Sequence, residues 1–297
     1  CSLTLGLVLL SCFYAKNASF DMEKYLSALT IADFELSDAT DGDFIGGYNP
    51  YGNTLNDDLI SSVETLDGLE KTGYLYSHQL SWDMDGQTVQ NLKDFCSSDL
   101  FSYIAGYAPD VAQATQDAIT SETVDTVMYG LDGIPLETIV QKQYLLAGTY
   151  NADEFATGNY VLAIGPAAEK EEFENGTVLP TASVGATVTI EGRQYTVMAV
   201  VYPVNSIEYG AMETGAGTGF NLGFILPADT FRELWPDNTL RKLFFNVADE
   251  EIEAAQKMLD DYTENVDSGL PVTSRKTMIE QYKSETRSSA VMGNTIS

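Results

Sequence analysis

The chain has 297 residues, which is enough for one large domain or two modest ones. It carries 44 acidic residues against 15 basic ones, a formal net charge of −29, which argues against nucleic-acid binding and against broad adhesion to an anionic membrane surface. With 44% hydrophobic and 11% aromatic residues, the composition excludes disorder over most of the chain. The 17 tyrosines and 13 phenylalanines, against one histidine, indicate packing and contact surfaces rather than acid–base chemistry.

Residues 1–14 are nearly all apolar or small, and three interpretations of them are open. The stretch is shorter than the roughly 20 residues of a membrane-spanning helix, so it is either the outer half of such a helix or a signal-peptide remnant. Alternatively, Leu9-Leu10-Ser11-Cys12 is a lipobox with a lipid on Cys12, although Phe13 and Tyr14 continue the apolar run where a polar linker is expected.

Residues 290–297 are again small and apolar, which predicts the start of a second membrane helix, the alternative being a frayed tail. Together the two ends predict a loop between two membrane helices. Six of the 15 bases lie near these ends, where they either face lipid headgroups or are simply solvated. These six are Lys16, Lys24, Arg275, Lys276, Lys283 and Arg287.

The first part of the chain alternates helix and strand. A helix is expected over 15–32, and the alternating polar and apolar residues of 31–37 predict a strand. A loop rich in glycine and aspartate follows over 38–53. One apolar stripe predicts a helix over 55–67, which Gly68 ends.

A strand with an aromatic face is predicted over 74–82, where aromatic and small polar side chains alternate. Residues 88–120 are expected to be mostly helical, with breaks near Gly106 and Pro109. A further strand is predicted over 123–129.

After residue 134 the pattern becomes mostly β. The continuous apolar run 160–164 predicts a strand, and residues 184–190 with 195–202 predict a hairpin. A strand over 222–226 follows a glycine-rich loop.

Helix and strand then alternate again, beginning with a strand over 240–247. Asp249 is expected to cap a helix, and 269–273 reads as an edge strand because proline cannot donate within a central ladder. Ser274 is expected to cap a last helix. The fold class predicted is therefore α+β, with a discontinuous α/β core, an inserted β-rich lobe and flanking ends of transmembrane helices.

The sequence contains only weak matches to phosphate-binding and calcium-binding motifs. Gly215–Gly219 superficially resembles a phosphate loop, but a strand and Pro227 follow it where a helix N-terminus is required. Asp38, Asp41 and Asp43 offer oxygen ligands for Ca²⁺, yet the EF-hand spacing is absent and such clusters are common in turns.

The single His78 lies on the aromatic face of its strand without the partners of a triad or a metal site, so a core or interface role is favoured. Cys96 is interpreted as a buried small hydrophobe. The sequence has no ATP-binding loop motif.

Four stretches resemble the extracytoplasmic, MacB-like periplasmic core domain of MacB/FtsX-type ABC transporter permeases. They are the apolar strand Tyr160–Gly165, the hairpin Val184–Val201, the strand and proline Gly223–Pro227, and the first strand Ile31–Phe34. Ala199 stands where the family often has glycine. The segment 88–122 is longer than the family leads one to expect, which leaves its role open.

The resemblance implies a division of the chain. The α/β (porter-like) core would comprise 15–133 and 228–289, and the inserted β-rich (sabre-like) lobe 134–227. Residues 1–14 and 290–297 would belong to two transmembrane helices.

The resemblance also implies a function without catalysis, cofactor or metal. The domain would lie on the extracellular side of the cell membrane, and would couple ATP hydrolysis by a cytoplasmic subunit to conformational work. The partners implied are that ATPase subunit, a second permease copy or paralogue, and an unidentified extracellular peptide, lipid or protein, with no nucleic acid. The alternatives are a lipid-anchored extracellular binding protein attached through Cys12, and a carboxylate-dependent hydrolase.

The glycine-rich loop 205–221 is the candidate contact with an extracellular partner, because long loops on a rigid scaffold commonly carry binding residues. The candidate residues within it are Asn205, Tyr209, Gly215, Gly217, Gly219 and Phe220.

Overall fold

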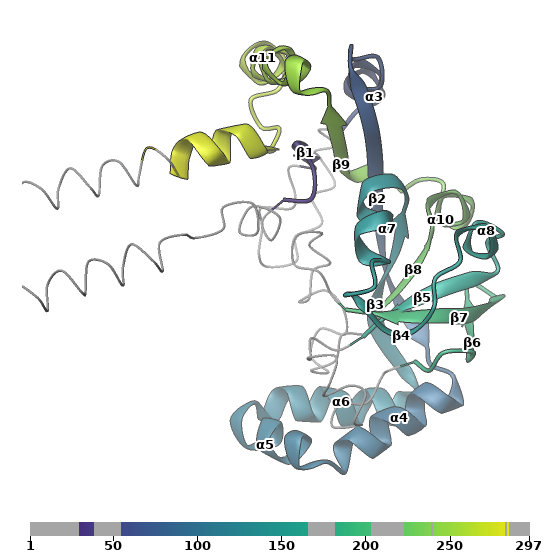
Figure 1. Cartoon of the computed structure of the whole chain (residues 1–297). Coiled ribbons are helices and arrows are strands. Elements are labelled where there is room, and N and C mark those ends of the chain that lie inside the picture. Colours follow the sequence, from purple (N-terminus) through teal and green to yellow (C-terminus); the bar gives the residue numbers. More distant parts are fainter. Residues whose placement is uncertain are drawn as a thin grey trace, which may run out of the picture.

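The structure, a computed structural model, describes residues 30–38, 55–165, 182–202, 223–238, 240–282 and 284. In this part of the chain ten strands form one mixed sheet with helices packed against it (Figure 1). The strands are β1 (Phe34–Ser37), β2 (Leu69–Asp83), β3 (Thr123–Leu131), β4 (Leu145–Gly148), β5 (Tyr160–Ile164), β6 (Thr187–Ile190), β7 (Arg193–Val201), β8 (Gly223–Pro227), β9 (Leu240–Val247) and β10 (Val272–Ser274). The helices are α3 (Asp57–Glu64), α4 (Gly86–Cys96), α5 (Asp99–Tyr107), α6 (Pro109–Ser121), α7 (Gly133–Ile139), α8 (Ala152–Phe155), α10 (Ala228–Leu234), the 3-10 turn η3 (Asp249–Glu251) and α11 (Ile252–Asn265).

The strand order is β10-β1-β9-β2-β3-β8-β5-β7-β4, with β6 paired to β7. Most neighbours are antiparallel, whereas β3 pairs with β8 and β5 with β7 in parallel. The strands of the predicted lobe 134–227 therefore join the predicted core through β8, which lies between β3 and β5. The division into core and lobe stays a prediction.

The longest element of the sheet is β2, whose 15 residues link two different partners. Its first half, Leu69–Tyr76, pairs with β9, and its second half, Leu75–Asp83, pairs with β3. The strand thus runs from the part of the sheet that contains β1 to the point where α4 begins (Figure 1).

The middle strands of the sheet, β3, β8 and β5, are buried on both faces. On β3, Val127, Tyr129 and Leu131 pack into one apolar cluster with α7, while Val124 and Met128 pack into another with α10 and the β6–β7 hairpin. A third cluster joins β1 and β9 to α3 and α11, with Phe34 and Phe245 stacked at 4.9 Å between ring centroids. Side chains on opposite faces of a strand alternate, so this pattern requires cover on both sides.

Most predicted elements are confirmed. The helices start and end near the predicted residues, and the stretch 88–120 divides into α4, α5 and α6 with Pro109 at the first position of α6. Gly68 follows α3 with φ +68°, a backbone conformation that glycine adopts without a steric penalty. The strand predicted from residue 269 is shorter than expected, but it lies at the edge of the sheet.

Two expectations differ from the structure, and two more fall mostly outside the residues that it describes. The lobe region contains the short helices α7 and α8 as well as strands. Helix α7 begins at Gly133, and the side chain of Asn151 caps α8, neither of which the strand pattern reveals. Asp249 does not cap α11: it lies in the turn η3 after Ala248, and α11 begins at Ile252. The helix predicted over 15–32 and the loop over 38–53 lie mostly outside the described residues.

The predicted membrane segments, 1–14 and 290–297, also lie outside the described residues. Within the described residues, every helix is too short or too polar to cross a bilayer.

A close approach of two glycines fixes α7 against β2. An added Cβ at Gly73 would lie 2.3 Å from Cδ of Pro135 and 2.5 Å from the backbone nitrogen of Ile134. Gly133 has φ +53°, and its Cβ would lie 2.1 Å from the carbonyl oxygen of Thr72. The start of α7 therefore rests directly on the backbone of β2.

This contact predicts the effect of Gly73→Ala. Since backbone atoms surround the site, the methyl group forces a shift of α7 and lowers the free energy of unfolding by about 2–3 kcal/mol. The matched control is Gly86→Ala in the first turn of α4, where no atom lies within 4 Å of the added Cβ. That change leaves the stability unaltered or raises it by up to about 1 kcal/mol. Urea unfolding followed by circular dichroism measures both, and equal effects of the two substitutions would contradict the close approach.

Candidate functional site

The first and last described segments of the chain meet at one edge of the sheet. Strand β1 lies between β10 and β9, and the chain becomes helical again at residue 275, directly after β10. The backbone N–H of Arg275 donates to the carbonyl of Asp33, at 2.9 Å. Ser274 caps this last helix as predicted, because its Oγ accepts from the N–H of Thr277 at 3.4 Å.

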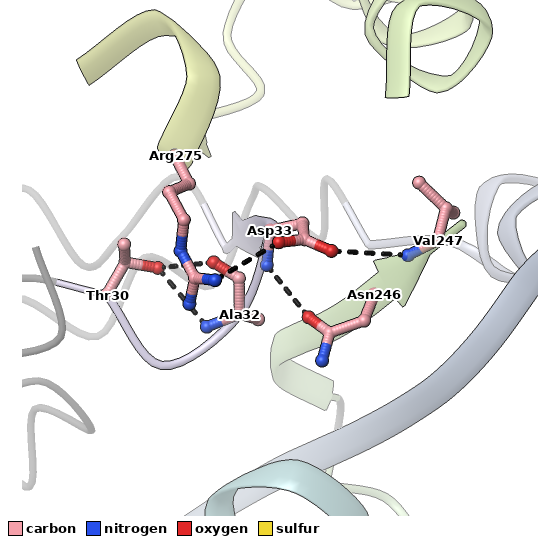
Figure 2. A network of polar contacts seen from close by, with 6 residues as sticks. All are labelled: Thr30, Ala32, Asp33, Asn246, Val247 and Arg275. Atoms are coloured by element: carbon pink, nitrogen blue, oxygen red, sulfur yellow. Dashed lines mark hydrogen bonds and ion pairs between the residues drawn. The ribbon is translucent and has the colours of Figure 1, made fainter. Parts of the chain in front are cut away.

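Asp33 is the centre of this junction (Figure 2). Its backbone N–H donates to Oδ1 of Asn246 at 2.8 Å, and its carboxylate faces two donors. Oδ1 accepts from Nη1 of Arg275 at 3.3 Å, and Oδ2 accepts from the N–H of Val247 at 3.4 Å. One acidic residue thereby connects the start of β1 with the end of β9 and with the last helix.

The residues before β1 are fixed as well (Figure 2). Oγ1 of Thr30 donates to the carbonyl of Ala32 at 2.8 Å and accepts from its N–H at 3.3 Å. Both residues are fully buried, and Ala32 packs into an apolar cluster with residues of β3 and β8. These hydroxyl–backbone hydrogen bonds form a local turn directly before β1.

A second ion pair on β1 is almost completely buried. Glu35 and Lys242 lie on one face, because Ser37 stands opposite Lys242 and Glu35 stands opposite Phe244. Nζ of Lys242 lies 2.7 Å from Oε1 of Glu35, and the two side chains are only 3% and 9% exposed. Taking two charges out of water is costly, so their mutual attraction matters most when one of them is removed.

A third pair closes the series, since Nη1 of Arg241 lies 3.5 Å from Oδ2 of Asp38. Three acids at the start of the described chain thus face three bases at its end: Asp33 with Arg275, Glu35 with Lys242 and Asp38 with Arg241. We call this set of six residues the β1 junction.

The most exposed pair of the β1 junction is Asp33–Arg275, with side chains 20% and 37% exposed. Nε of Arg275 is buried and has no hydrogen-bond acceptor within the described part of the chain. The guanidinium group contacts Asp33 through Nη1 instead, and this contact ties the last helix to the start of β1.

The sequence-predicted site residues fall elsewhere. The glycine-rich loop with Asn205, Tyr209, Gly215, Gly217, Gly219 and Phe220 lies outside the described residues, as do Asp41, Asp43 and Cys12. Asp38 pairs with Arg241, and the described residues contain no group of three His, Cys, Asp or Glu side chains arranged for a metal.

His78 packs against an aromatic side chain of α10's C-terminal end. Its ring stacks on Trp235 with centroids 4.7 Å apart, and its Nδ1 lies 3.0 Å from Oδ1 of Asn238. Burial lowers the pKa of the imidazole, although the contact with Asn238 acts in the opposite direction. Cys96 is half-buried beside Phe95 and Phe101, and burial raises the pKa of its thiol. Both placements agree with the structural interpretations of these residues.

A small acidic cleft of about 300 Å³ lies between α3, β2 and α10, and nothing in the sequence pattern predicted it. Its polar lining includes Asp57, Glu64, Tyr74, Tyr76, Asp132, Asp229 and Arg232. Burial first, and then the hydrogen bond to Glu64, raises the pKa of Tyr74 to about 12. Burial also raises the pKa of the Asp132 carboxyl, whose Oδ1 accepts from the N–H of Tyr74 at 2.9 Å.

The buried pair of the β1 junction gives a stability prediction. Lys242→Met leaves the Glu35 carboxylate buried without its ammonium partner, so the free energy of unfolding falls by about 3–5 kcal/mol. The double change Lys242→Met with Glu35→Leu restores most of this loss, because an apolar pair replaces the charges. A double variant no more stable than Lys242→Met in urea unfolding would refute the pairing. Lys257→Met, which removes an exposed pair with Asp261 on α11, serves as control and changes stability by less than about 0.5 kcal/mol.

Asp132 gives a prediction for pH. Its folded pKa is raised above the unfolded one, so the protonated carboxyl is favoured in the folded state and its contribution to stability is lost as pH rises through the raised pKa. Asp132→Asn keeps the acceptor for Tyr74 but does not titrate. The melting temperature of this variant relative to the parent chain is therefore expected to increase as pH rises from 4 towards neutrality. A difference that stays constant over this range would count against the raised pKa.

A family model described as the MacB-like periplasmic core domain matches residues 51–262. Among solved structures, the chain is similar to the periplasmic region of MacB from Actinobacillus actinomycetemcomitans, with 9% sequence identity and a TM-score of 0.48, over 89% of this chain and 98% of that chain. It is also similar to the extracellular domain of the noncanonic ABC-type transporter YknZ from Gram-positive bacteria, with 12% identity and a TM-score of 0.39, over 73% of this chain and 88% of that chain. A search of curated proteins returned no match.

Proposed function

We propose that this chain, which belongs to the family of MacB-like periplasmic core domains, couples ATP hydrolysis in a cytoplasmic subunit to movement outside the membrane. The chain is the extracellular domain of a MacB/FtsX-type ABC transporter permease. Its task is conformational rather than catalytic: force enters at the ends of the chain and is delivered to an extracellular partner. The remaining partners proposed are the ATPase subunit and a second permease copy or paralogue.

The observation that supports coupling is the β1 junction. A domain moved by helices at its two ends needs both ends to act on the same rigid element. Here the segment that enters the sheet and the helix that leaves it share contacts with Asp33, and β1 is hydrogen-bonded to both β9 and β10. In this proposal, a displacement of the segment before β1 or of the helix after β10 therefore moves the sheet itself.

The transmission then follows β2. This strand pairs with β9 beside β1, continues along β3 and ends where α4 begins, so one extended element connects the β1 junction with the helices α4–α6. A packed sheet deforms little, because its interior is close-packed on both faces. Rigid-body motion of the whole domain is the proposed output, which requires two stable arrangements of the transporter and no reactive side chain.

The test uses Arg275 in the full-length permease assembled with its ATPase. Spin labels at Asp153→Cys on the exposed helix α8 of two permease copies report the ATP-dependent change in distance between the domains, after the native cysteines of the full-length permease are replaced by serine. Arg275→Met removes the contact with Asp33 and is expected to reduce this change at least about twofold, while ATP hydrolysis continues.

Two controls separate coupling from folding. Arg275→Lys keeps a donor for Asp33 and is expected to retain most of the movement. Arg193→Met, at the start of β7, removes an ion pair with Glu233 of α10. Strand β7 lies far from the β1 junction in strand order, so this change is expected to leave the movement unchanged. Full movement in Arg275→Met would refute the role of the β1 junction. A lipid found on Cys12 by mass spectrometry would support the alternative of an anchored binding protein instead.

A further inference from the structure

The helices α4, α5 and α6 are inserted between two neighbouring strands of the sheet (Figure 1). The chain leaves β2 at Asp83 and enters β3 at Thr123, and these two residues stand opposite each other in the β2–β3 ladder. The N–H of Met84 also donates to the carbonyl of Glu122 at 2.8 Å. Both ends of this helical unit therefore join the sheet at one narrow point, where β2 ends and β3 begins.

That point is a ribbon of only two strands, which we call the neck. The pairing of β2 with β9 stops at Tyr76, and the pairing of β3 with β8 starts at Val127. Within the described residues, the rungs from Leu80–Thr126 to Asp83–Thr123 therefore pair only with each other. A two-stranded ribbon twists more than a wide sheet and is marginally stable by itself, so other contacts must hold the helical unit in a fixed orientation.

Trp82 lies in the neck and reaches the β6–β7 hairpin. Its Nε1 donates to the carbonyl of Thr189 on β6 at 2.7 Å, although β3, β8, β5 and β7 lie between β2 and β6 in the strand order. The sheet therefore curls until the end of β2 meets β6. The indole ring also packs edge to face on Phe224 of β8, with centroids 5.0 Å apart, and Trp82 is only 2% exposed.

The same indole belongs to the apolar cluster that holds the helical unit. Val89 and Leu92 of α4 and Ala118 of α6 pack into this cluster, together with Val188 of β6. One side chain of the neck is thus shared by the hairpin and by two of the three helices.

The hydrogen bond makes this contact specific. Apolar side chains keep most of their packing after a small sliding movement, whereas the indole N–H is satisfied only near its acceptor. A movement of the helical unit that drew Trp82 away from Thr189 would leave a buried donor unpaired, which is unfavourable. The bond therefore opposes rocking of the helices on the neck.

We propose that Trp82 is a positioning residue, which fixes the helical unit to the β6–β7 hairpin so that α4–α6 move with the sheet as one body. The inference deepens the proposed function, on which it rests. A displacement that travels along β2 arrives at the neck, and a flexible neck would absorb it. With Trp82 bound to Thr189, the displacement is carried into the helices instead.

The experiment measures the distance between the helical unit and the sheet within one domain. In the cysteine-free full-length permease assembled with its ATPase, one permease copy carries spin labels at Ser102→Cys on α5 and Asp153→Cys on α8, which are both exposed. The parent assembly is expected to give one narrow distance distribution. Trp82→Phe keeps an aromatic ring but has no N–H for Thr189, so the distribution is expected to widen at least about twofold.

A matched control and a second variant separate positioning from folding. Trp235→Phe is the same chemical change at the other tryptophan, which stacks on His78, and it should leave the distribution unchanged. Replacing Trp82 by 3-benzothienylalanine keeps the shape of the indole and removes only its N–H, so it tests the hydrogen bond even where Trp82→Phe folds poorly. Equal widths in the parent and the benzothienyl variant overturn the proposal, as does a broad distribution in the parent.

Labels in both permease copies give a readout that a mere loss of stability would not produce. The ATP-dependent change between the copies is measured once with labels at Asp153→Cys and once with labels at Ser102→Cys. In Trp82→Phe the change at α8 is expected to persist, while the change at α5 falls at least about twofold and ATP hydrolysis continues. Equal losses at both positions overturn the proposal. Since the width within one domain is measured without ATP, failure of this inference is distinct from failure of the coupling, which Arg275→Met tests.

Discussion

The capture of strand β1 between β9 and β10 is the interaction on which the rest of this domain depends. β1 has four residues, too few to be stable alone, and its partners come from the other end of the chain. The Asp33–Arg275 contact joins residues 242 positions apart, and the Glu35–Lys242 contact joins residues 207 apart. Closing so long a loop is unfavourable in entropy, so the contacts that close it must be numerous and mutually supporting. Stacked phenylalanines on one face of β1 and a buried ion pair on the other meet this need.

Local sequence patterns predicted most of the elements and little of their assembly. The spacing of apolar residues predicts helices such as α3 and α11 and strands such as β9, because this spacing can be read from each segment alone. The short elements α7, β4, α8 and α10 were missed, because each is held by tertiary contacts rather than by its own periodicity. Gly73 illustrates the reason: its role is visible only when Pro135 is placed against it.

The β1 junction could be predicted only in part. The alternation of 31–37 indicated a strand with one polar side, and acids at Asp33 and Glu35 on a strand of this kind call for buried partners. The sequence could not name those partners, since pairing with Lys242 and Arg275 follows from register and strand order. The candidate loop 205–221 lies outside the described residues, and its role stays a prediction.

The proposed transmission places a mechanical requirement on this part of the fold, because a domain that passes movement on has to be stiff where the movement enters. In the β1 junction, three ion pairs and the backbone hydrogen bonds of β1 with β9 and β10 join the first and last described segments to one sheet. Strand β2 pairs with β9 beside this junction and then with β3. In the proposed mechanism, a displacement that begins at Asp33 would therefore reach the end of β2, where α4 begins.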